Sequence, residues 1–338
     1  MSWRVRSATM ADLDALVGLA ALTGGGFTNL PQDREALARR LAWSDASFAR
    51  ADAETPQDEL YILLLENAET GQIGGTGMVF SRIGAQWPFY SYKLGALSQT
   101  SKELGRTLRM QFLSLTTDHD GASEVGGLFL HPDLRTGGLG RLLARSRYLF
   151  IAQHRARFGA KLLAELRGVM DDGGNSPFWD ALGRQFFGMS FPEADAFNAA
   201  HGNQFIADLM PKHPIYTALL PESARAVIGQ PHPTGRAALA MLQAEGFVYD
   251  NYVDIFDGGP TVTARTDDVR TVRESRSAPL LAAPAVAGPA ALVACGQLQA
   301  FRAALATVTA QDAGVAIDAA AATALGAAPG EVIRHAPC

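Results

Sequence analysis

One short segment constrains this chain more than any other. Residues 128–140, with the sequence LFLHPDLRTGGLG, predict a buried strand at Leu128–Leu130 followed by a helix from Gly138 to about Phe158. Glycines at a strand-to-helix turn let the backbone approach a ligand closely, and the free N–H groups of a first helical turn attract anions. The spacing Arg135-x-x-Gly138-x-Gly140 therefore predicts a cradle for a pyrophosphate.

Other interpretations of this glycine-rich turn fit less well. A dinucleotide-binding fingerprint needs G-x-G-x-x-G spacing and an acidic residue roughly 20 positions later, and it follows the first strand of its fold. Here several predicted strands precede the turn. No G-x-x-x-x-G-K-[ST] motif occurs, which excludes a P-loop. A tight connection without a ligand is the remaining alternative.

Composition and charge exclude several classes of protein. A chain of 338 residues that is 48% hydrophobic and 19% charged can bury a large core, as one large domain or one domain with an appendage. Its net charge of −5 argues against a protein devoted to nucleic acid, which needs a basic surface. The uncharged stretch Ala278–Gly296 is interrupted by three prolines, so it predicts a linker leading into a strand rather than a membrane span.

The first residues and the cysteines suggest the compartment. The N-terminal residues contain no apolar signal core. The two cysteines, Cys295 and Cys338, have no metal-ligand spacing, and such sparse use fits the reducing cytosol. We therefore expect a cytoplasmic protein that holds no metal.

Alternating and periodic apolar segments predict an α/β fold, in which a mixed sheet is flanked by helices. A strand followed by a capped helix that ends at Gly24–Gly26 opens the chain, and Ser176 and Pro177 begin another helix. Strands are predicted at Trp3–Arg6, Tyr61–Leu65, Ile73–Ser81, Phe89–Leu97, Met110–Leu115, Leu162–Leu166 and Phe247–Phe256, and further helices at Gln32–Trp43 and Ala237–Ala244. The pattern changes after Pro260, so we expect one domain over residues 1–260 and a small β-rich C-terminal unit over residues 261–338.

Two histidines have an unusual context. His213 and His232 each stand beside prolines, and prolines on both sides of His232 stiffen the backbone that would hold its imidazole. Histidine titrates near neutral pH, so it can move a proton to or from an amine or a thiolate. A rigid turn with an incidental histidine is an equally good interpretation of these residues alone.

Several blocks of the sequence together identify a family. The turn with its Arg135-x-x-Gly138-x-Gly140 spacing resembles the acyl-CoA loop of the GNAT superfamily of N-acyltransferases. An ordered set of blocks then resembles the arginine N-succinyltransferase family. They are TGGGFTNLP (23–31), SKEL (101–104), LFL with RTGGLG (128–130 and 135–140), SRYLF (146–150), ELRG (165–168), SPFW (176–179), LMPKHPIY (209–216), GQPHP (229–233) and DIFDGGP (254–260).

The resemblance implies a reaction and roles for particular residues. It implies transfer of a succinyl group from succinyl-CoA, a co-substrate rather than a resident cofactor, to the α-amino group of L-arginine. The proton-donor histidine of the family falls on His232, and its succinyl-CoA-binding leucine falls on Leu128. Leu128 would act through its backbone N–H, beside Arg135, Gly138 and Gly140 of the phosphate loop. Enzymes of this kind are also expected to form homo- or hetero-oligomers.

Two alternatives to this function stay open. One is a succinyltransferase that prefers ornithine, and the other is a non-catalytic subunit that binds coenzyme A. The sequence also does not decide which residues bind the guanidinium of arginine and the carboxylate of the succinyl group. The acidic candidates for the guanidinium are Glu124, Asp171 and Asp254, and the basic candidates for the succinyl carboxylate are Lys212 and Arg167.

Overall fold

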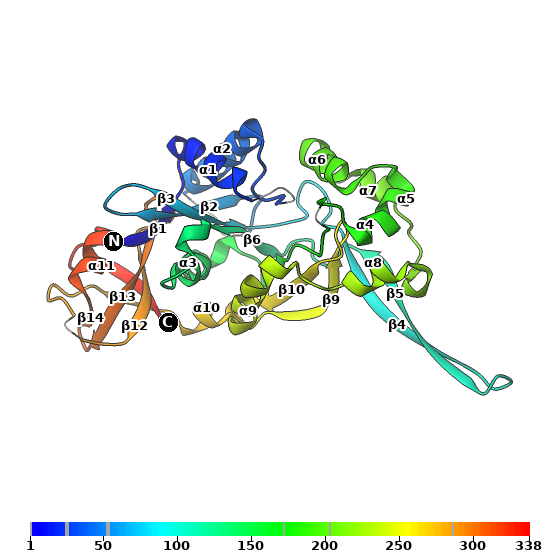
Figure 1. Ribbon diagram of the computed structural model, residues 1–338. Coiled ribbons are helices and arrows are strands. Elements are labelled where there is room, and N and C mark those ends of the chain that lie inside the picture. Colours follow the sequence, from blue (N-terminus) through cyan, green and yellow to red (C-terminus); the bar gives the residue numbers. More distant parts are fainter. Residues whose placement is uncertain (1, 24–26, 52–54, 172, 203, 286) are drawn as a thin grey trace. The chain divides into compact units, whose positions relative to one another are not determined.

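The computed structural model describes residues 2–23, 27–51, 55–171, 173–202, 204–285 and 287–338. The chain forms two units. The first unit comprises Met1–Arg82, Ser123–Leu162 and Arg265–Cys338, and the second comprises Ile83–Ala122 and Leu163–Ala264. The expected α/β class, a large sheet flanked by helices, is confirmed (Figure 1).

The sheet of the first unit follows from its most apolar segment. Strand β2 (Leu60–Asn67) is buried at all eight positions, as a strand covered on both faces must be. It pairs antiparallel with β1 and with β3, and a hairpin connects β2 to β3. The order in this unit is β11-β15-β12-β13-β1-β2-β3-β6, and β14 pairs with β13. The strands are β1 (Trp3–Ser7), β3 (Ile73–Phe80), β6 (Ser123–Leu130), β11 (Arg276–Pro279), β12 (Ala290–Cys295), β13 (Arg302–Gln311), β14 (Gly314–Ile317) and β15 (Val332–Pro337).

Helices cover both faces of these strands. Helices α1 (Leu13–Ala21) and α2 (Arg34–Ala49) pack on one face, against alternate β2 residues such as Ile62 and Leu64 (Figure 1). Helix α3 (Leu139–Gln153) packs on the other face. The capping box predicted before α1 is present at Thr9 and Asp12. The predicted end of this helix, at residues 24–26, lies outside the described residues.

The last part of the chain extends the same sheet and has its own core. Strand β13 pairs with β1, and helix α11 (Ala319–Leu325) packs on Val293, Ile317 and Ile333. The short helix α10 (Arg270–Glu274) precedes it. These elements lie in the part of the chain for which a small β-rich unit is expected. The boundary expected at residue 260 stays a prediction.

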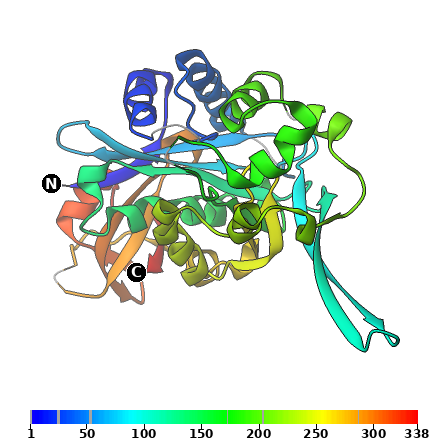
Figure 2. The same cartoon turned by 45° about the vertical axis from the view of Figure 1, so that its right-hand side comes forward.

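The second unit contains six strands and several short helices within its described residues. The strand order is β7-β10-β9-β4-β5-β8. Strands β4 and β5 continue past their neighbours as a two-stranded ribbon whose tip projects from the unit (Figure 2). The strands are β4 (Ser91–Ser101), β5 (Arg106–Thr116), β7 (Lys161–Glu165), β8 (Ile215–Tyr216), β9 (Val248–Asp254) and β10 (Pro260–Arg265). The helices are α4 (Pro177–Ala181), α5 (Gly183–Phe187), α6 (Phe191–His201), α7 (Gln204–Leu209), α8 (Glu222–Val227) and α9 (Arg236–Ala244).

The core of the second unit is aromatic. Trp179 of α4 is fully buried between the rings of Phe187 and Phe256, which stack on it. Ser176 caps α4 by accepting a hydrogen bond from the Trp179 N–H at 3.1 Å, and Pro177 stands at the first helical position, as predicted. Within the described ranges, no helix combines the length and the apolar character that crossing a lipid bilayer requires.

A buried ion pair in the first unit gives a prediction about stability. Arg157 donates to Glu59 at 3.2 Å and to the Tyr61 hydroxyl at 2.9 Å. Removing Arg157 leaves the buried Glu59 carboxylate with Arg50, 2.8 Å away, as its remaining cation, and takes the Arg157 bond from the Tyr61 hydroxyl. Arg157→Met should therefore lower the free energy of unfolding by roughly 3 kcal/mol. Arg155→Met is the control, since its pair with Asp267 is partly exposed and worth about 1 kcal/mol or less. Denaturant unfolding that gives equal losses for the two variants would contradict the prediction.

Candidate active site

The predicted phosphate loop connects β6 to α3. Gly137 and Gly138 adopt φ angles of +64° and +81°, which only glycine adopts readily, and Gly138 is the residue before the helix. The first bond that closes a helical turn runs from the Leu142 N–H to the Gly138 carbonyl, at 3.0 Å. The N–H groups of Gly140 and Arg141 precede that bond, so they are available to an anion.

The charge around this loop favours a negative ligand. Arg135 and Arg141 are exposed, and the first turn of α3 has no acidic residue. The Arg135 Nε donates to the Leu130 carbonyl at 3.3 Å, which holds its guanidinium at the loop. The structure thus brings Arg135, Gly138 and Gly140 together in one exposed turn with the geometry of an anion site.

Leu128 lies at an irregularity of strand β6. On β3 a single residue, Gly77, lies opposite two residues of β6, Gly127 and Leu128. This is a β-bulge, which leaves one residue outside the ladder of hydrogen bonds. Gly127 has a φ of +55°, and a Cβ there would come within 2.7 Å of the Met78 side chain. The bulge therefore requires glycine, and it changes the direction of the Leu128 backbone.

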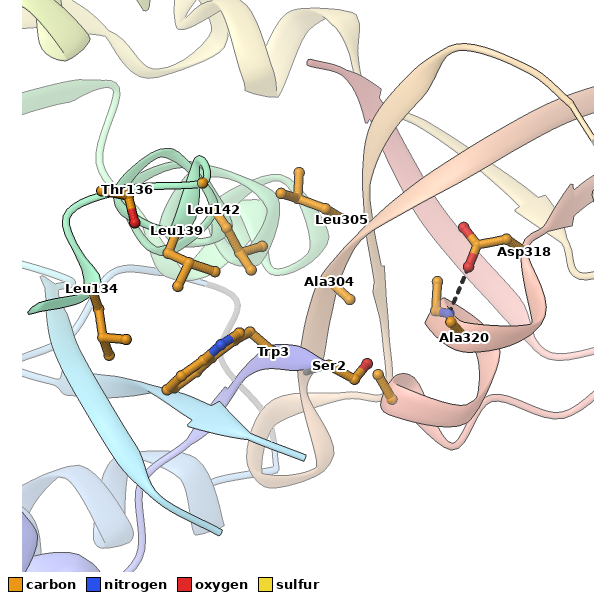
Figure 3. Close-up of a pocket in the computed structure, with 13 residues that line it drawn as sticks. Ser2, Trp3, Leu134, Thr136, Leu139, Leu142, Ala304, Leu305, Asp318 and Ala320 are labelled. Atoms are coloured by element: carbon orange, nitrogen blue, oxygen red, sulfur yellow. Dashed lines mark hydrogen bonds between the residues drawn. The ribbon is translucent and has the colours of Figure 1, made fainter. Parts of the chain in front are cut away.

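A cavity of about 440 Å³ adjoins the phosphate loop (Figure 3). Thr136, Gly137 and Leu139 line it from the loop side, and Leu305 and Asp318 line it from the last part of the chain. Asp318 is held in place because it caps α11, accepting from the Ala321 N–H at 2.9 Å. A second space of similar volume adjoins Gly137 and Gly138. Both spaces belong to the first unit.

His232 lies in the second unit, just before a single 3₁₀ turn at Pro233–Gly235. The backbone N–H of His232 donates to the Arg167 carbonyl at 2.7 Å, which connects His232 to the segment after β7. Its Nδ1 accepts from the Thr234 N–H at 3.3 Å and lies 2.7 Å from the Thr234 hydroxyl. The imidazole is half-buried, and these contacts fix one ring nitrogen while Nε2 stays available.

The surroundings favour a neutral His232. Partial burial, and then the charge of Arg167, hold the pKa of His232 below its ordinary value. The neutral imidazole can accept a proton at neutral pH and can donate it later. This is the protonation state that general base chemistry needs.

Asp257 supports the loop that contains His232. Its carboxyl accepts from the Gly168 N–H at 2.7 Å and from the Gly259 N–H at 2.8 Å. Burial, and then the neighbouring Asp254, raise the pKa of Asp257. Because Gly168 follows Arg167 directly, these bonds also fix the carbonyl to which His232 donates.

The other candidates from the sequence have varied surroundings. Glu124 lies on β6 of the first unit and accepts from Asn29 at 3.2 Å. Asp171 accepts from backbone N–H groups of its own turn, and Asp254 does the same at Phe256. Lys212 is exposed, and Arg167 lies close enough to His232 to lower its pKa. No three His, Cys, Asp or Glu side chains in the described ranges are grouped to hold a metal.

Comparisons with known proteins cover nearly the whole chain. Residues 3–271 match the family described as "Arginine N-succinyltransferase beta subunit". The chain belongs to this family. Residues 276–337 match the family's C-terminal domain.

Individual relatives extend the comparison. The arginine N-succinyltransferase of Salmonella schwarzengrund is 43% identical over 338 residues, which cover 98% of this chain and 96% of that protein. The enzyme of the same name from Salmonella paratyphi B is 42% identical over 333 residues, with the same coverage of both proteins. The solved structure titled arginine/ornithine succinyltransferase subunit AI, from Pseudomonas aeruginosa, superposes with a TM-score of 0.87 at 35% identity. It covers 99% of this chain and 98% of that one.

Sequence reasoning missed two features of this family member. The bulge is indicated only by the paired glycines before Leu128, which also fit an ordinary strand. Arg147 is buried on α3, and the signal for it is its position four residues after Leu143, on the apolar face of the helix. The roles of Leu128, Arg135, Gly138, Gly140 and His232 stay predictions.

The loop geometry gives a second prediction. In Gly138→Val the positive φ becomes strained, and the branched side chain moves the N–H groups that would contact the pyrophosphate. We expect the Michaelis constant for succinyl-CoA to rise at least tenfold, because an anion site depends on N–H direction. Gly140→Val, whose Cβ would meet only Leu130 at 3.6 Å, should give a smaller increase. If steady-state kinetics gave an unchanged Michaelis constant for succinyl-CoA in both variants, the loop would be excluded as the pyrophosphate cradle.

Proposed function

We propose that this protein transfers a succinyl group from succinyl-CoA to the α-amino group of L-arginine. The observation that carries the proposal is the 43% identity to an arginine N-succinyltransferase over nearly the full length of both chains. The exposed glycine turn at the start of α3 supports it independently, because it offers N–H groups and cations to a pyrophosphate.

In the proposed reaction the first unit binds the acyl donor. The N–H groups at the start of α3 contact the coenzyme A pyrophosphate, and Arg135 and Arg141 supply positive charge. The backbone N–H of Leu128, at the bulge, donates to the thioester carbonyl oxygen. A donor at that point stabilises the negative charge that develops on the oxygen when the amine attacks.

His232 moves the proton in this proposal. Its neutral imidazole takes the proton from the attacking amine and then gives it to the departing coenzyme A thiolate, so the proton balance closes. Attack is direct, without an acyl-cysteine intermediate. Burial raises the pKa of the Cys295 thiol to about 11, which leaves it protonated and a poor nucleophile at neutral pH.

A second acceptor has specific support. The Pseudomonas aeruginosa structure is titled an arginine/ornithine succinyltransferase subunit. Ornithine differs from arginine only at the distal end of the side chain, so the same attack on the thioester would serve both amino acids. We propose ornithine as the alternative acceptor.

The proposal extends to assembly, compartment and domain organisation. The family description and the Pseudomonas title both use the word subunit, which supports a homo- or hetero-oligomer. The exposed Leu97, Leu104 and Leu108 on the β4–β5 ribbon offer apolar surface for such contacts.

We propose a cytoplasmic protein in which residues 261–338 form the small β-rich C-terminal unit. Its separate family match over residues 276–337 supports this division.

Turnover with four substrate pairs tests the proposal. Purified protein with succinyl-CoA and arginine should release coenzyme A thiol and form N-succinylarginine, detected by a thiol reagent and by mass spectrometry. Acetyl-CoA should react at least 100-fold less efficiently, because a site built for a carboxylate leaves its cation unpaired against a methyl group. The same donors with ornithine measure acceptor preference. Coenzyme A binding without any turnover would instead indicate a non-catalytic subunit.

His232 should control turnover rather than donor binding. His232→Ala should lower kcat by roughly 10²–10⁴-fold, the range for loss of general acid–base catalysis, with little change in succinyl-CoA affinity. His213→Ala is the matched control, since His213 is exposed beside prolines and has no assigned role. Turnover lost in the His213 variant and kept in the His232 variant would move the role to His213.

The pH dependence has a definite direction. The pKa of His232 is lowered, so the neutral base form persists to pH values below the ordinary histidine range. In wild type, kcat/KM, which reports the ionisation of the free enzyme, should fall on the acidic side with a midpoint below pH 6.5, and His232→Ala should lose this limb. A midpoint clearly above pH 6.5 would contradict the assignment.

A further inference from the structure

One buried arginine of the first unit has no acidic partner among the described residues. Arg147, on α3, is 3% exposed. Its Nε donates to the Ala144 carbonyl at 3.1 Å, and its Nη1 donates to the Gly126 carbonyl at 3.2 Å. Among the described residues, no carboxylate forms an ion pair with it and no acceptor bonds its Nη2. The guanidinium therefore retains donors and a full charge that the protein does not satisfy.

This is an expensive arrangement unless something compensates the charge. Taking a cation out of water costs several kcal/mol, and carbonyl groups offset only part of that cost. Burial accordingly lowers the pKa of Arg147. Nη2, which has no acceptor among the described residues, can donate to a carboxylate, the anion that a guanidinium binds best.

The position of Arg147 relates it to the bulge in β6. Gly126, whose carbonyl it contacts, directly precedes the bulge residues Gly127 and Leu128. Gly77 lies opposite the bulge, and a Cβ added at this glycine would lie 3.1 Å from the Arg147 side chain. The Arg147 side chain thus lies against both β3 and β6, next to the bulge.

The dimensions suit a four-carbon acyl group. Gly126 and Leu128 are two residues apart, and because the bulge fits three residue steps of β6 opposite two of β3, they are separated by roughly 5 Å along the strand. The two carbonyl carbons of a succinyl group are separated by three carbon–carbon bonds of about 1.5 Å each, so they lie roughly 4 Å apart. An acyl group whose thioester oxygen contacts the Leu128 N–H can therefore direct its terminal carboxylate to a guanidinium beside Gly126.

We infer that Arg147 binds the terminal carboxylate of the succinyl group and selects this acyl donor over uncharged ones. The inference rests on the proposed function. It replaces the two basic candidates taken from the sequence: Lys212 is exposed, and Arg167 lies beside His232 in the second unit. Arg147 belongs to the same unit as the phosphate loop and the bulge, and no acid of the described part of the chain pairs with it.

Comparison of two donors tests the inference. Butyryl-CoA has the same four-carbon chain as succinyl-CoA with a methyl group in place of the carboxylate. In Arg147→Met, kcat/KM for succinyl-CoA should fall roughly 30- to 1,000-fold, because one member of a buried charge pair is removed. The value for butyryl-CoA should stay within about threefold or rise. Equal losses for both donors would overturn the inference.

Arg145→Met is the matched control. Arg145 is also buried on α3, but it donates to the Thr271 hydroxyl at 2.8 Å and to the Pro337 carbonyl at 2.7 Å. Its removal should lower stability and leave the ratio of succinyl-CoA to butyryl-CoA unchanged. A drop in the ratio as large as that of Arg147→Met would show that the effect is structural and would contradict the role of Arg147.

A second variant covers the case in which Arg147→Met does not fold. Arg147→Lys keeps a cation but replaces the planar fork with a single ammonium, so the donor ratio should fall about tenfold. A folded lysine variant with the wild-type ratio would overturn the inference. Failure of the proposed function has a different signature, since wild-type protein would then not turn over succinyl-CoA at all. A wild-type enzyme that uses both donors equally well would refute only the role of Arg147.

Discussion

The extra residue in strand β6 is the constraint on which the candidate donor site depends. Two residues opposite Gly77 force Gly127 into a positive φ, with the Met78 side chain filling the space where a Cβ would be. The same irregularity takes Leu128 out of the regular ladder, so its backbone can serve a ligand. Helix α3 then begins at the glycine turn, which aims its first N–H groups at solvent.

Backbone hydrogen bonds also position the candidate proton-transfer group. His232 is fixed by its own N–H on the Arg167 carbonyl and by Thr234 at Nδ1. Asp257 fixes the neighbouring Gly168, so a buried carboxyl acts on the histidine only through the main chain. A group held in this way keeps its ring direction while its pKa is set by burial and by Arg167. Main-chain and Thr234 contacts therefore fix the ring, whereas burial and the Arg167 side chain set its acidity.

Much of the fold was predictable because its signals are local. A continuous apolar run marked β2, and Ser176 with Pro177 marked the start of α4. The bulge was not predictable, because it is a property of the pairing between β3 and β6 and not of either strand alone. Arg147 was not predicted for a similar reason. Helix periodicity places it on the inner face, but only the tertiary structure shows that it pairs with no acid among the described residues. The sequence was enough to predict the phosphate loop and His232 as candidates. The structure adds the direction of the loop N–H groups and the lowered pKa of His232.

The two parts of the proposed reaction make opposite electrostatic demands. The donor carries a pyrophosphate and a carboxylate, so its binding needs cations and N–H groups, which the first unit supplies at the α3 turn and at Arg147. Proton transfer instead needs a histidine that is neutral at rest, and burial, followed by the positive charge of Arg167, keeps the pKa of His232 low. A second effect follows from the same chemistry. A buried cation keeps a strong field until an anion neutralises it, so the succinyl carboxylate that Arg147 is proposed to bind would also cancel most of the field of this arginine.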